Sequence, residues 1–486
     1  MSTAEHSNVT KLKTQNLDAL VELQRSKFRE EGEVTYTKRV DRLKRLKAMI
    51  VENKKDFAIT TKREFNGARS YEFSLFSEFA SKVEAIDYSL KHLKDWMKSE
   101  RRKTNKPMNF LGGRSEVRYF PKGVIGIISP WNLPFGLTVS PLTSALAAGN
   151  RAMLKPSEHV PETAAMFAEV VPNYFPADEV SVVTGGQDIS QKFAELPFDH
   201  LLFTGSTHVG AKVMQSASKN LVPVTLELGG KSPVIIGRTA KIDLAGTRLT
   251  FGKLLNGGQL CLSPDYVVVP EDLEEQLISR VAHEAQSMYP NITENMDYAG
   301  VFNENHLARL QNYIDDAVDK GAKLTIIGDE NYHASKDNRR MPLHILQNVN
   351  EDMLVMHEEI FGPILPIMTY SNIAEVPDMI EPRRNPLAMY YFGKDKSEQE
   401  YLLSHVQSGG VCINDITLHY IQEDLPFGGV GASGMGAYHG PEGFKNMSHA
   451  RAIYSQTMID VLPIIGARPP FGEKFRKRIN KILGAI

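Results

Sequence analysis

Short apolar segments alternate with helical segments between residues 124 and 228, and this alternation limits how the chain can fold more than any other feature. The β-rich apolar segments are 124–128, 152–154, 181–183, 200–203 and 224–228. Helical spacing of apolar residues occurs between them, at 137–148, 162–171, 189–196 and 209–219. Strands joined by crossover helices form a parallel, doubly wound sheet, so we expect an α/β fold.

A second α/β unit is predicted further along the chain. Its expected strands are 266–269, 323–327, 387–392 and 411–414. Its expected helices are 273–288 and 306–320. Helices are also expected across 40–57, capped by Thr37, and across 86–97, with an extended segment at 119–120 before a turn. The chain therefore contains two predicted α/β units that follow a helical N-terminal part.

Polar or glycine-rich turns follow each strand of the first unit. They are residues 129–135, 155–158, 184–186, 204–210 and 229–233. Open parallel sheets bind ligands beyond the carboxyl ends of their strands. Five such turns along one edge therefore predict a binding site there.

Two of these turns have groups that suit a nucleotide. Gly205, Ser206 and Gly210 lie where a helix opens, and free N–H groups and the helix dipole favour a phosphate there. An ordinary capped turn explains the same residues, because this turn does not match the Gly-x-Gly-x-x-Gly fingerprint. Lys155 and Glu158 follow the second strand, where they can reach ribose hydroxyls, although both residues are also common in solvated loops.

Cys261 is one of only two cysteines, and it follows glycines at the end of a helix predicted at 249–255. Glycines allow backbone N–H groups to converge on one point, so the thiol could be a nucleophile beside oxyanion donors. The alternative is a small buried apolar residue, as most free cysteines are. Cys412 lies in an apolar segment and is expected in the core.

Two further side chains suit this chemistry. Glu227 lies in an apolar strand, and burial raises the pKa of a carboxyl group toward that of a general base. A salt bridge with Lys231 is the alternative. Asn132 lies in a rigid turn and could donate a second hydrogen bond to an oxyanion, although a structural Asx turn is an equal alternative.

Composition excludes several classes of protein. A net charge of −2 over 486 residues gives no global field for nucleic acid. Two distant cysteines without Cys-x-x-Cys or a His-Cys cluster predict neither a disulfide framework nor a metal site, and they favour a reducing, cytoplasmic setting. No apolar segment approaches the roughly 20 residues that span a bilayer, and the polar start lacks a signal-peptide core.

The two ends differ from the rest of the chain. Residues 1–18 are expected to form a loose polar arm. Residues 456–486 are expected to form a tail whose last part is a helix with one apolar face, from Phe471 to Leu483, surrounded by five basic residues. Such a helix could lie weakly on an anionic membrane surface, dock on its own subunit, cover a substrate mouth or stay in solvent.

Seven ordered segments between residues 20 and 455 resemble the aldehyde dehydrogenase superfamily. They are Pro-Trp-Asn (130–132), Lys-Pro-Ser-Glu (155–158), Phe-Thr-Gly-Ser-Thr (203–207), Glu-Leu-Gly-Gly-Lys-Ser-Pro (227–233), Asn-x-Gly-Gln-x-Cys (256–261), Glu-Glu-Ile-Phe-Gly-Pro (358–363) and Pro-Phe-Gly-Gly (426–429). Residues 223–227, 431–436 and 438–440 resemble its class three branch, which includes fatty, aromatic and bacterial coniferyl aldehyde dehydrogenases.

The resemblance implies two doubly wound α/β domains and a small β oligomerisation arm. The NAD-binding domain would comprise 19–104 and 123–226, the catalytic domain 227–411, and the arm 105–122 and 412–455. Homodimers are usual in this branch, so a second copy of the chain is an expected partner.

The resemblance also implies a role for each site residue. Cys261 would be the nucleophile and Glu227 the base, while Asn132 and the Cys261 amide would bind the oxyanion. The residues expected at the cofactor are Trp131, Lys155, Glu158, Gly205, Ser206, Gly210, Glu359 and Phe361. Glu158 would repel a 2′-phosphate and so favours NAD, although the branch often tolerates NADP.

The implied reaction oxidises a hydrophobic aldehyde, aryl or medium-to-long aliphatic, to the carboxylic acid. Cys261 would form a thiohemiacetal and then a thioester, and Glu227 would activate the hydrolytic water. One alternative is a CoA-acylating enzyme, against which Glu227 argues because it speeds hydrolysis. The other is a non-catalytic nucleotide-binding protein, which predicts lost catalytic residues. His208 has no expected role.

Overall fold

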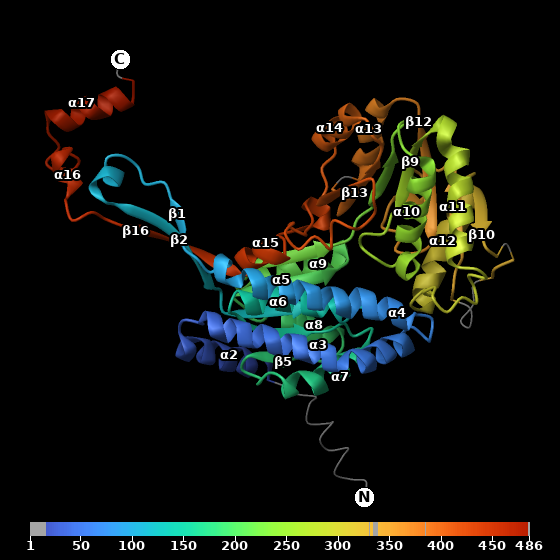
Figure 1. The fold of residues 1–486 in the computed structure, drawn as a ribbon, viewed down its shortest axis with the longest axis horizontal. Helices are drawn as coiled ribbons and strands as arrows, with labels where there is room; N and C mark the ends of the chain where they lie inside the picture. Colours follow the sequence, from blue (N-terminus) through green and yellow to red (C-terminus); the bar gives the residue numbers. More distant parts are fainter. Residues whose placement is uncertain (1–15, 330, 334–338, 384, 485–486) are drawn as a thin grey trace, which may run out of the picture.

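The computed structural model describes residues 16–329, 331–333, 339–383 and 385–484. Two helix-covered sheets lie side by side, and a small three-stranded sheet projects from the part that contains the first of them (Figure 1). Both sheets are mostly parallel, which confirms the predicted α/β class with two doubly wound units.

The first sheet has the strand order β15-β7-β6-β3-β4-β5. Its parallel strands are β3 (Val124–Ile128), β4 (Arg151–Lys155), β5 (Val180–Val182), β6 (His200–Gly205) and β7 (Val224–Leu228), and β15 (Gly434–Met435) pairs antiparallel with β7. The intervening helices are α6 (Gly136–Ala147), α7 (Pro161–Val170), α8 (Gln187–Ala194) and α9 (Thr207–Ser218). All five predicted strands and all four predicted helices are confirmed.

Helices from the N-terminal part of the chain cover this sheet. They are α2 (Leu17–Glu31), α3 (Tyr36–Glu64), α4 (Tyr71–Ser74), the π-helix η2 (Leu75–Ala80) and α5 (Ser81–Trp96). Thr35 caps α3 by accepting from the Lys38 amide, so the predicted cap at Thr37 was wrong. The expected polar arm at 1–18 lies largely outside the described residues, and its last two residues belong to α2.

The second sheet has the order β10-β11-β12-β9-β8-β13-β14 and is parallel except at β10. Its strands are β8 (Pro233–Ile236), β9 (Tyr266–Pro270), β10 (Lys323–Ile327), β11 (Leu343–Gln347), β12 (Ile364–Tyr370), β13 (Ala388–Phe392) and β14 (Gly410–Ile413). Its helices are α10 (Ile242–Leu254), α11 (Glu274–Met288), α12 (Glu304–Asp319), α13 (Val376–Ile380) and α14 (Lys396–His405). Single 3₁₀ turns connect several of these elements, at Leu255–Gly258, Glu271–Leu273, Leu354–Met356, Ile373–Glu375 and Glu381–Arg383.

The projecting sheet is antiparallel and has the order β1-β2-β16. It consists of β1 (Glu100–Arg102), β2 (Arg114–Pro121) and β16 (Ser448–Ser455), with α15 (Gly440–Asn446) before β16. The tail helices α16 (Val461–Ile464) and α17 (Glu473–Ile482) follow near its outer end (Figure 1). The strand expected in this arm near residue 412 is instead β14, which pairs with β13, so Cys412 lies in the second sheet.

The chain crosses from the first sheet to the second between β7 and β8, through Gly229 and Gly230. Glu227 therefore lies in the last parallel strand of one sheet, and the predicted domain boundary at 226/227 falls inside β7. The carboxyl ends of the first sheet's strands face the loops of the second unit across this crossing. A site between the two units is thus built from both.

Candidate active site

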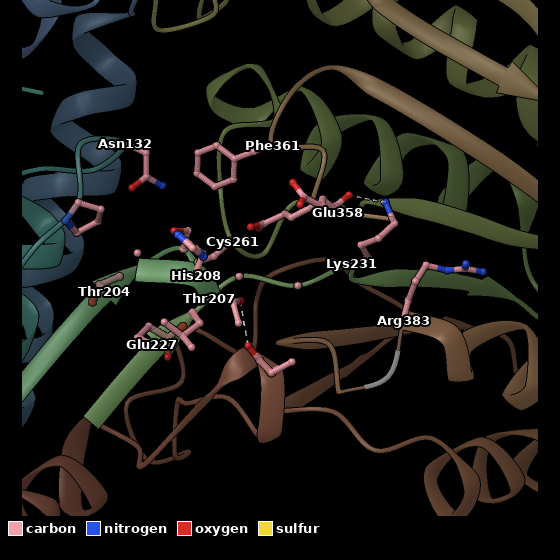
Figure 2. Close-up of a pocket in the computed structure, with 18 of the residues that line it drawn as sticks. Asn132, Thr204, Thr207, His208, Glu227, Lys231, Cys261, Glu358, Phe361 and Arg383 are labelled. Atoms are coloured by element: carbon pink, nitrogen blue, oxygen red, sulfur yellow. Dashed lines mark hydrogen bonds between the residues drawn. The ribbon is translucent and has the colours of Figure 1, made fainter. Parts of the chain in front are cut away.

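A cavity of about 620 Å³ lies at the carboxyl ends of β6 and β7, where the two units meet (Figure 2). Eight of the eleven predicted site residues line it, namely Trp131, Asn132, Gly205, Ser206, Glu227, Cys261, Glu359 and Phe361. This volume is within the ordinary range of a ligand site. Residues separated by more than 200 positions in sequence therefore meet at one place.

The Cys261 loop owes its shape to three consecutive left-handed residues. Asn256, Gly257 and Gly258 have φ angles of 50°, 63° and 75°, which asparagine and glycine tolerate better than other residues. A Cβ atom at Gly258 would overlap the carbonyl oxygen of Gly362. The glycine thus lets the Cys261 loop approach the loop that carries Phe361.

Asn132 is joined to this loop by its side chain. Its Nδ2 donates to the carbonyl oxygen of Gln259 at 3.0 Å, and the side chain is buried. Gln259 in turn donates to Asn256 and accepts from the amide of Phe302. The amide group of Asn132 has two N–H bonds, so one can hold the loop while the other is free to serve the cavity.

Glu227 is 1% exposed, and its Oε1 has no hydrogen-bond partner among the residues that the structure describes. Burial raises the pKa of this carboxyl group well above its ordinary value, and the charge of Glu359 raises it further. The alternative salt bridge with Lys231 is wrong, because Lys231 pairs with Asp265 and donates to the carbonyl oxygens of Val355 and Glu358. A carboxyl group with this environment can take up a proton near neutral pH.

Cys261 is partly buried and lines the cavity, so its sulfur is not sequestered in the core. Burial raises the pKa of the thiol well above its ordinary value, and the charges of Glu227 and Glu359 add to the shift. The backbone N–H groups of Cys261 and Leu262 act in the opposite direction. The thiolate is therefore favoured by local amides and disfavoured by neighbouring carboxylates.

The loop with Glu359 and Phe361 is held from behind. Asp265 accepts from the Ile360 amide at 2.9 Å, and Arg309 donates to the Ile360 carbonyl at 2.8 Å. Burial, followed by the charge of Asp265, raises the pKa of Glu359 to about 8. Phe361 has a φ of 49°, and its ring lies edge-on to Trp131 at 5.5 Å between centroids.

A glycine admits Glu359 to this position. A Cβ atom at Gly229 would overlap the Glu359 carboxylate. Asp265 and Arg309, which hold the loop from behind, have no local sequence signal, because their partners lie about 50 to 95 positions away. The sequence motif does contain Lys231, but it predicted this lysine only as a salt-bridge partner for Glu227.

Three predicted residues do not line the cavity. Lys155 is buried at the end of β4, with its Nζ 3.5 Å from Glu158, which also accepts from Ser190. Both therefore lie at the same edge of the first sheet as the cavity, but outside its lining. Gly210 packs α9 against β7, since a Cβ there would be 2.6 Å from Leu228.

Several histidine and arginine side chains of the cavity were not assigned a role from sequence. His208, in the first turn of α9, lines the cavity together with His306, Arg309, His357 and Arg383. Burial lowers the pKa of His306 to about 4. Among the described residues, no cluster of histidine, cysteine or carboxylate side chains has the size of a metal site. No helix in the same part of the chain is long and apolar enough to cross a membrane.

The sequence matches the model of the aldehyde dehydrogenase family over residues 2–453. It is 43% identical to a probable coniferyl aldehyde dehydrogenase of Pseudomonas aeruginosa over 96% of each chain. It is 37% identical to the 4,4'-diaponeurosporen-aldehyde dehydrogenase of Staphylococcus aureus over 90% of this chain and 93% of the other.

Solved structures have the same fold. The substrate-bound AldH of Staphylococcus aureus superposes with a TM-score of 0.88 and 33% identity, over 96% of this chain and 100% of that one. An aldehyde dehydrogenase of Mycobacterium tuberculosis complexed with NAD+ superposes with a TM-score of 0.80 and 25% identity, over 91% and 90% of the chains.

The electrostatics of Cys261 predict its reactivity toward iodoacetamide. We expect slow alkylation at neutral pH and a rate that still rises near about pH 9, because burial and two carboxylates raise the thiol pKa. Glu227→Gln removes one negative charge, so its rate near that pH should be several-fold higher. The measurement is mass spectrometry of the Cys261 peptide in a Cys412→Ser background, and a plateau near about pH 7 would contradict the interpretation.

Proposed function

This chain belongs to the aldehyde dehydrogenase family, and on that premise we propose that it oxidises a hydrophobic aldehyde to the carboxylic acid through Cys261 and Glu227. The observation that carries the proposal is the meeting of a thiol, a buried carboxyl group and a buried amide around one cavity. These are the groups that nucleophilic attack, water activation and oxyanion binding need.

In the first step the Cys261 sulfur attacks the aldehyde carbon and forms a thiohemiacetal. The oxygen that becomes negative is stabilised by Asn132 Nδ2 and by the backbone N–H of Cys261. Each such donor is worth roughly 3–4 kcal/mol in transition-state stabilisation. Asn132 suits this role because its bond to Gln259 fixes the amide before any substrate arrives.

The cavity fits NAD(P), the cofactor of this family. When bound, NAD(P) supplies the acceptor for the hydride that leaves the aldehyde carbon. The N-terminal turn of α9 with Gly205 and Ser206 would hold its pyrophosphate, and Glu359 and Phe361 its nicotinamide end. Lys155 and Glu158 would reach the adenosine ribose, and the negative charge of Glu158 favours NAD over NADP.

Loss of hydride from the thiohemiacetal carbon leaves a thioester on Cys261. Glu227 then takes a proton from water, and the resulting hydroxide attacks the thioester carbon and releases the carboxylic acid. The carboxyl group is suited to this task because its orphan Oε1 can accept from that water. Hydrolysis restores the thiol for another cycle.

Hydrolysis is favoured over the two alternatives by residues of the site. A CoA-acylating enzyme must protect its thioester from water, and a buried carboxyl group beside the sulfur works against that. A non-catalytic nucleotide-binding protein has no need for the thiol, carboxyl and amide groups that this cavity retains.

The substrate class follows from the relatives. One is a probable coniferyl aldehyde dehydrogenase, and another acts on a diaponeurosporen aldehyde according to its name. We therefore infer an aldehyde with a large apolar body, either aryl or long-chain. The aromatic side chains of Trp131 and Phe361 at the cavity agree with an apolar environment near the reacting carbon.

The assembly is proposed to be a homodimer in the cytoplasm. Within the described residues β16 pairs only with β2, so its second edge is available to another chain. This open edge supports the oligomerisation role of the arm. The other proposed domains are an NAD-binding domain at 19–104 and 123–226 and a catalytic domain at 227–411. Two free cysteines are consistent with a reducing compartment.

The tail is proposed to contact anionic membrane surfaces weakly. Residues 100–121 and 448–484, here called the basic projection, contain thirteen Lys and Arg against four Asp and Glu. Their net charge is +9, so the remainder of the chain has −11. Ile482 and Leu483 of the tail are 68% and 75% exposed beside these cations. Apolar and basic side chains that are exposed together suit a lipid interface.

The function is tested with the purified protein and a panel of aldehydes, comparing NAD with NADP. We expect the highest kcat/KM for coniferyl or long-chain aldehydes with NAD. Cys261→Ser should reduce turnover by at least about 10³-fold, because the hydroxyl is a weak nucleophile, while NAD still binds in a fluorescence titration. Aldehyde oxidation by that variant at the original rate would contradict the mechanism, and Cys412→Ser is the matched control with full activity.

Glu227→Gln separates the two halves of the reaction. We expect one equivalent of NADH per site in a burst, then a stall on the thioester, because an amide cannot accept the proton from water. Stopped-flow absorbance measures the burst, and mass spectrometry of the intact protein identifies the acyl adduct. Steady turnover at the original rate would remove Glu227 from its role, and acyl-CoA as the main product with CoA present would favour the CoA-acylating alternative.

Truncation after residue 467 tests the membrane proposal. We expect the full chain to pellet with vesicles of anionic lipid at low salt, and the truncated chain to pellet several-fold less, because the helix supplies both apolar area and charge. A charge variant, with the five basic residues of α17 changed to glutamine, should behave like the truncation. Equal pelleting of all three contradicts membrane contact, and a changed aldehyde KM in both variants would instead indicate a cover over the substrate mouth.

A further inference from the structure

Arg69 and Glu78 form a fully buried ion pair behind the active site. Arg69 Nη2 lies 2.7 Å from Glu78 Oε1, and both side chains are 0% exposed. Burying two charges costs hydration free energy, and apolar residues can often replace such a pair without loss of stability. Net stability is therefore a weak explanation for the pair, and the groups that it binds are a better one.

Both partners also bind one loop. Arg69 Nη1 donates to the carbonyl oxygen of Asn132 at 2.8 Å. Glu78 Oε2 accepts from the amides of Phe135 at 2.8 Å and Gly136 at 3.1 Å. The ion pair thus binds both ends of the segment from Asn132 to the start of α6. Glu78 also accepts hydrogen bonds from backbone N–H groups that have no partner within the helix at its N-terminus.

The helical region around the pair fixes the directions in which the Arg69 and Glu78 side chains point. Glu78 lies in the π-helix η2, and π-turns re-aim side chains and are frequent at functional sites. Arg69 is fixed further by donation to Ser74 at 3.2 Å and by Phe65, whose ring centroid is 4.7 Å from the guanidinium carbon. A rigid cation and a rigid anion can define the position of the loop to a fraction of an ångström.

We propose that Arg69 and Glu78 are positioning residues, which place the Asn132 amide at the oxyanion formed on Cys261. The proposal rests on the function proposed above for Asn132. The backbone of Asn132 is held through its carbonyl by Arg69, and its side chain is held by Gln259. These two anchors come from the helical layer and from the Cys261 loop, so they fix the donor relative to the sulfur.

The central test is Arg69→Lys, which keeps the charge but cannot reach both partners with one ammonium group. We expect kcat to fall about 10- to 100-fold while the affinity for NAD changes less than about twofold, because the oxyanion donor moves and the cofactor site does not. Glu78→Gln, which keeps the shape, should give a smaller fall in the same direction. It also provides a second variant if Arg69→Lys does not fold.

A double-mutant cycle with Asn132→Ala distinguishes positioning from general stability. If Arg69 acts through Asn132, Arg69→Lys should lower kcat by less than about twofold in the Asn132→Ala background, because the donor is already gone. Multiplicative losses in the double variant would overturn the proposal. So would an unchanged kcat in Arg69→Lys while Asn132→Ala is impaired. If Asn132→Ala itself is fully active, the oxyanion role fails first, and the positioning role fails with it.

Arg42 supplies the matched control. Its guanidinium is 0% exposed, like that of Arg69, and it pairs with Glu31 at 2.9 Å and Glu179 at 3.1 Å, away from the cavity lining. Arg42→Lys should lower the melting temperature as much as Arg69→Lys does, with kcat unchanged. An equal loss of kcat in both variants would show that buried-pair damage alone explains the effect.

Discussion

The carboxyl group of Glu227 is buried without a cation, and its charge raises the pKa of the neighbouring Cys261 thiol. The arrangement of charges around the site depends on this unfavourable contact between the Glu227 carboxyl group and the Cys261 thiol. A lysine is close by in sequence at Lys231, yet it is committed to Asp265 and to two carbonyl oxygens. Because no cation of the described residues neutralises Glu227, the pKa of its carboxyl group stays raised, and a raised pKa suits the proposed proton acceptor.

The cations near the cavity hold loops instead. Lys231 with Asp265 and Arg309 fixes the segment that carries Glu359 and Phe361, and Arg69 with Glu78 fixes the segment that carries Asn132. Each arrangement uses a buried charge to orient backbone at a distance from the reacting atoms. The two α/β units thereby present preorganised loops to a shared cavity, and the direct crossing from β7 to β8 keeps those loops close.

Much of this architecture could be predicted from the sequence, for identifiable reasons. β3 and β7 were placed at their observed bounds because buried parallel strands are short continuous apolar segments. β8, β11 and β12 were missed, since β8 follows a glycine turn almost at once, β11 contains His344 and Gln347, and β12 contains Pro366. Eight residues predicted from motifs line the cavity, whereas Asp265, Arg309 and Arg69 bind partners roughly 50 or more positions away and have no local pattern.

Charge is distributed very unevenly over the molecule, with +9 on the basic projection and −11 on the remainder. Such a chain is a strong electric dipole, and it feels a torque in any field before contact is made. Two copies that lie side by side at low ionic strength repel when their dipoles are parallel and attract when they are antiparallel. A two-fold axis perpendicular to the dipole gives the antiparallel alignment, so a symmetric pair of this chain would place each basic projection toward the acidic remainder of the other copy.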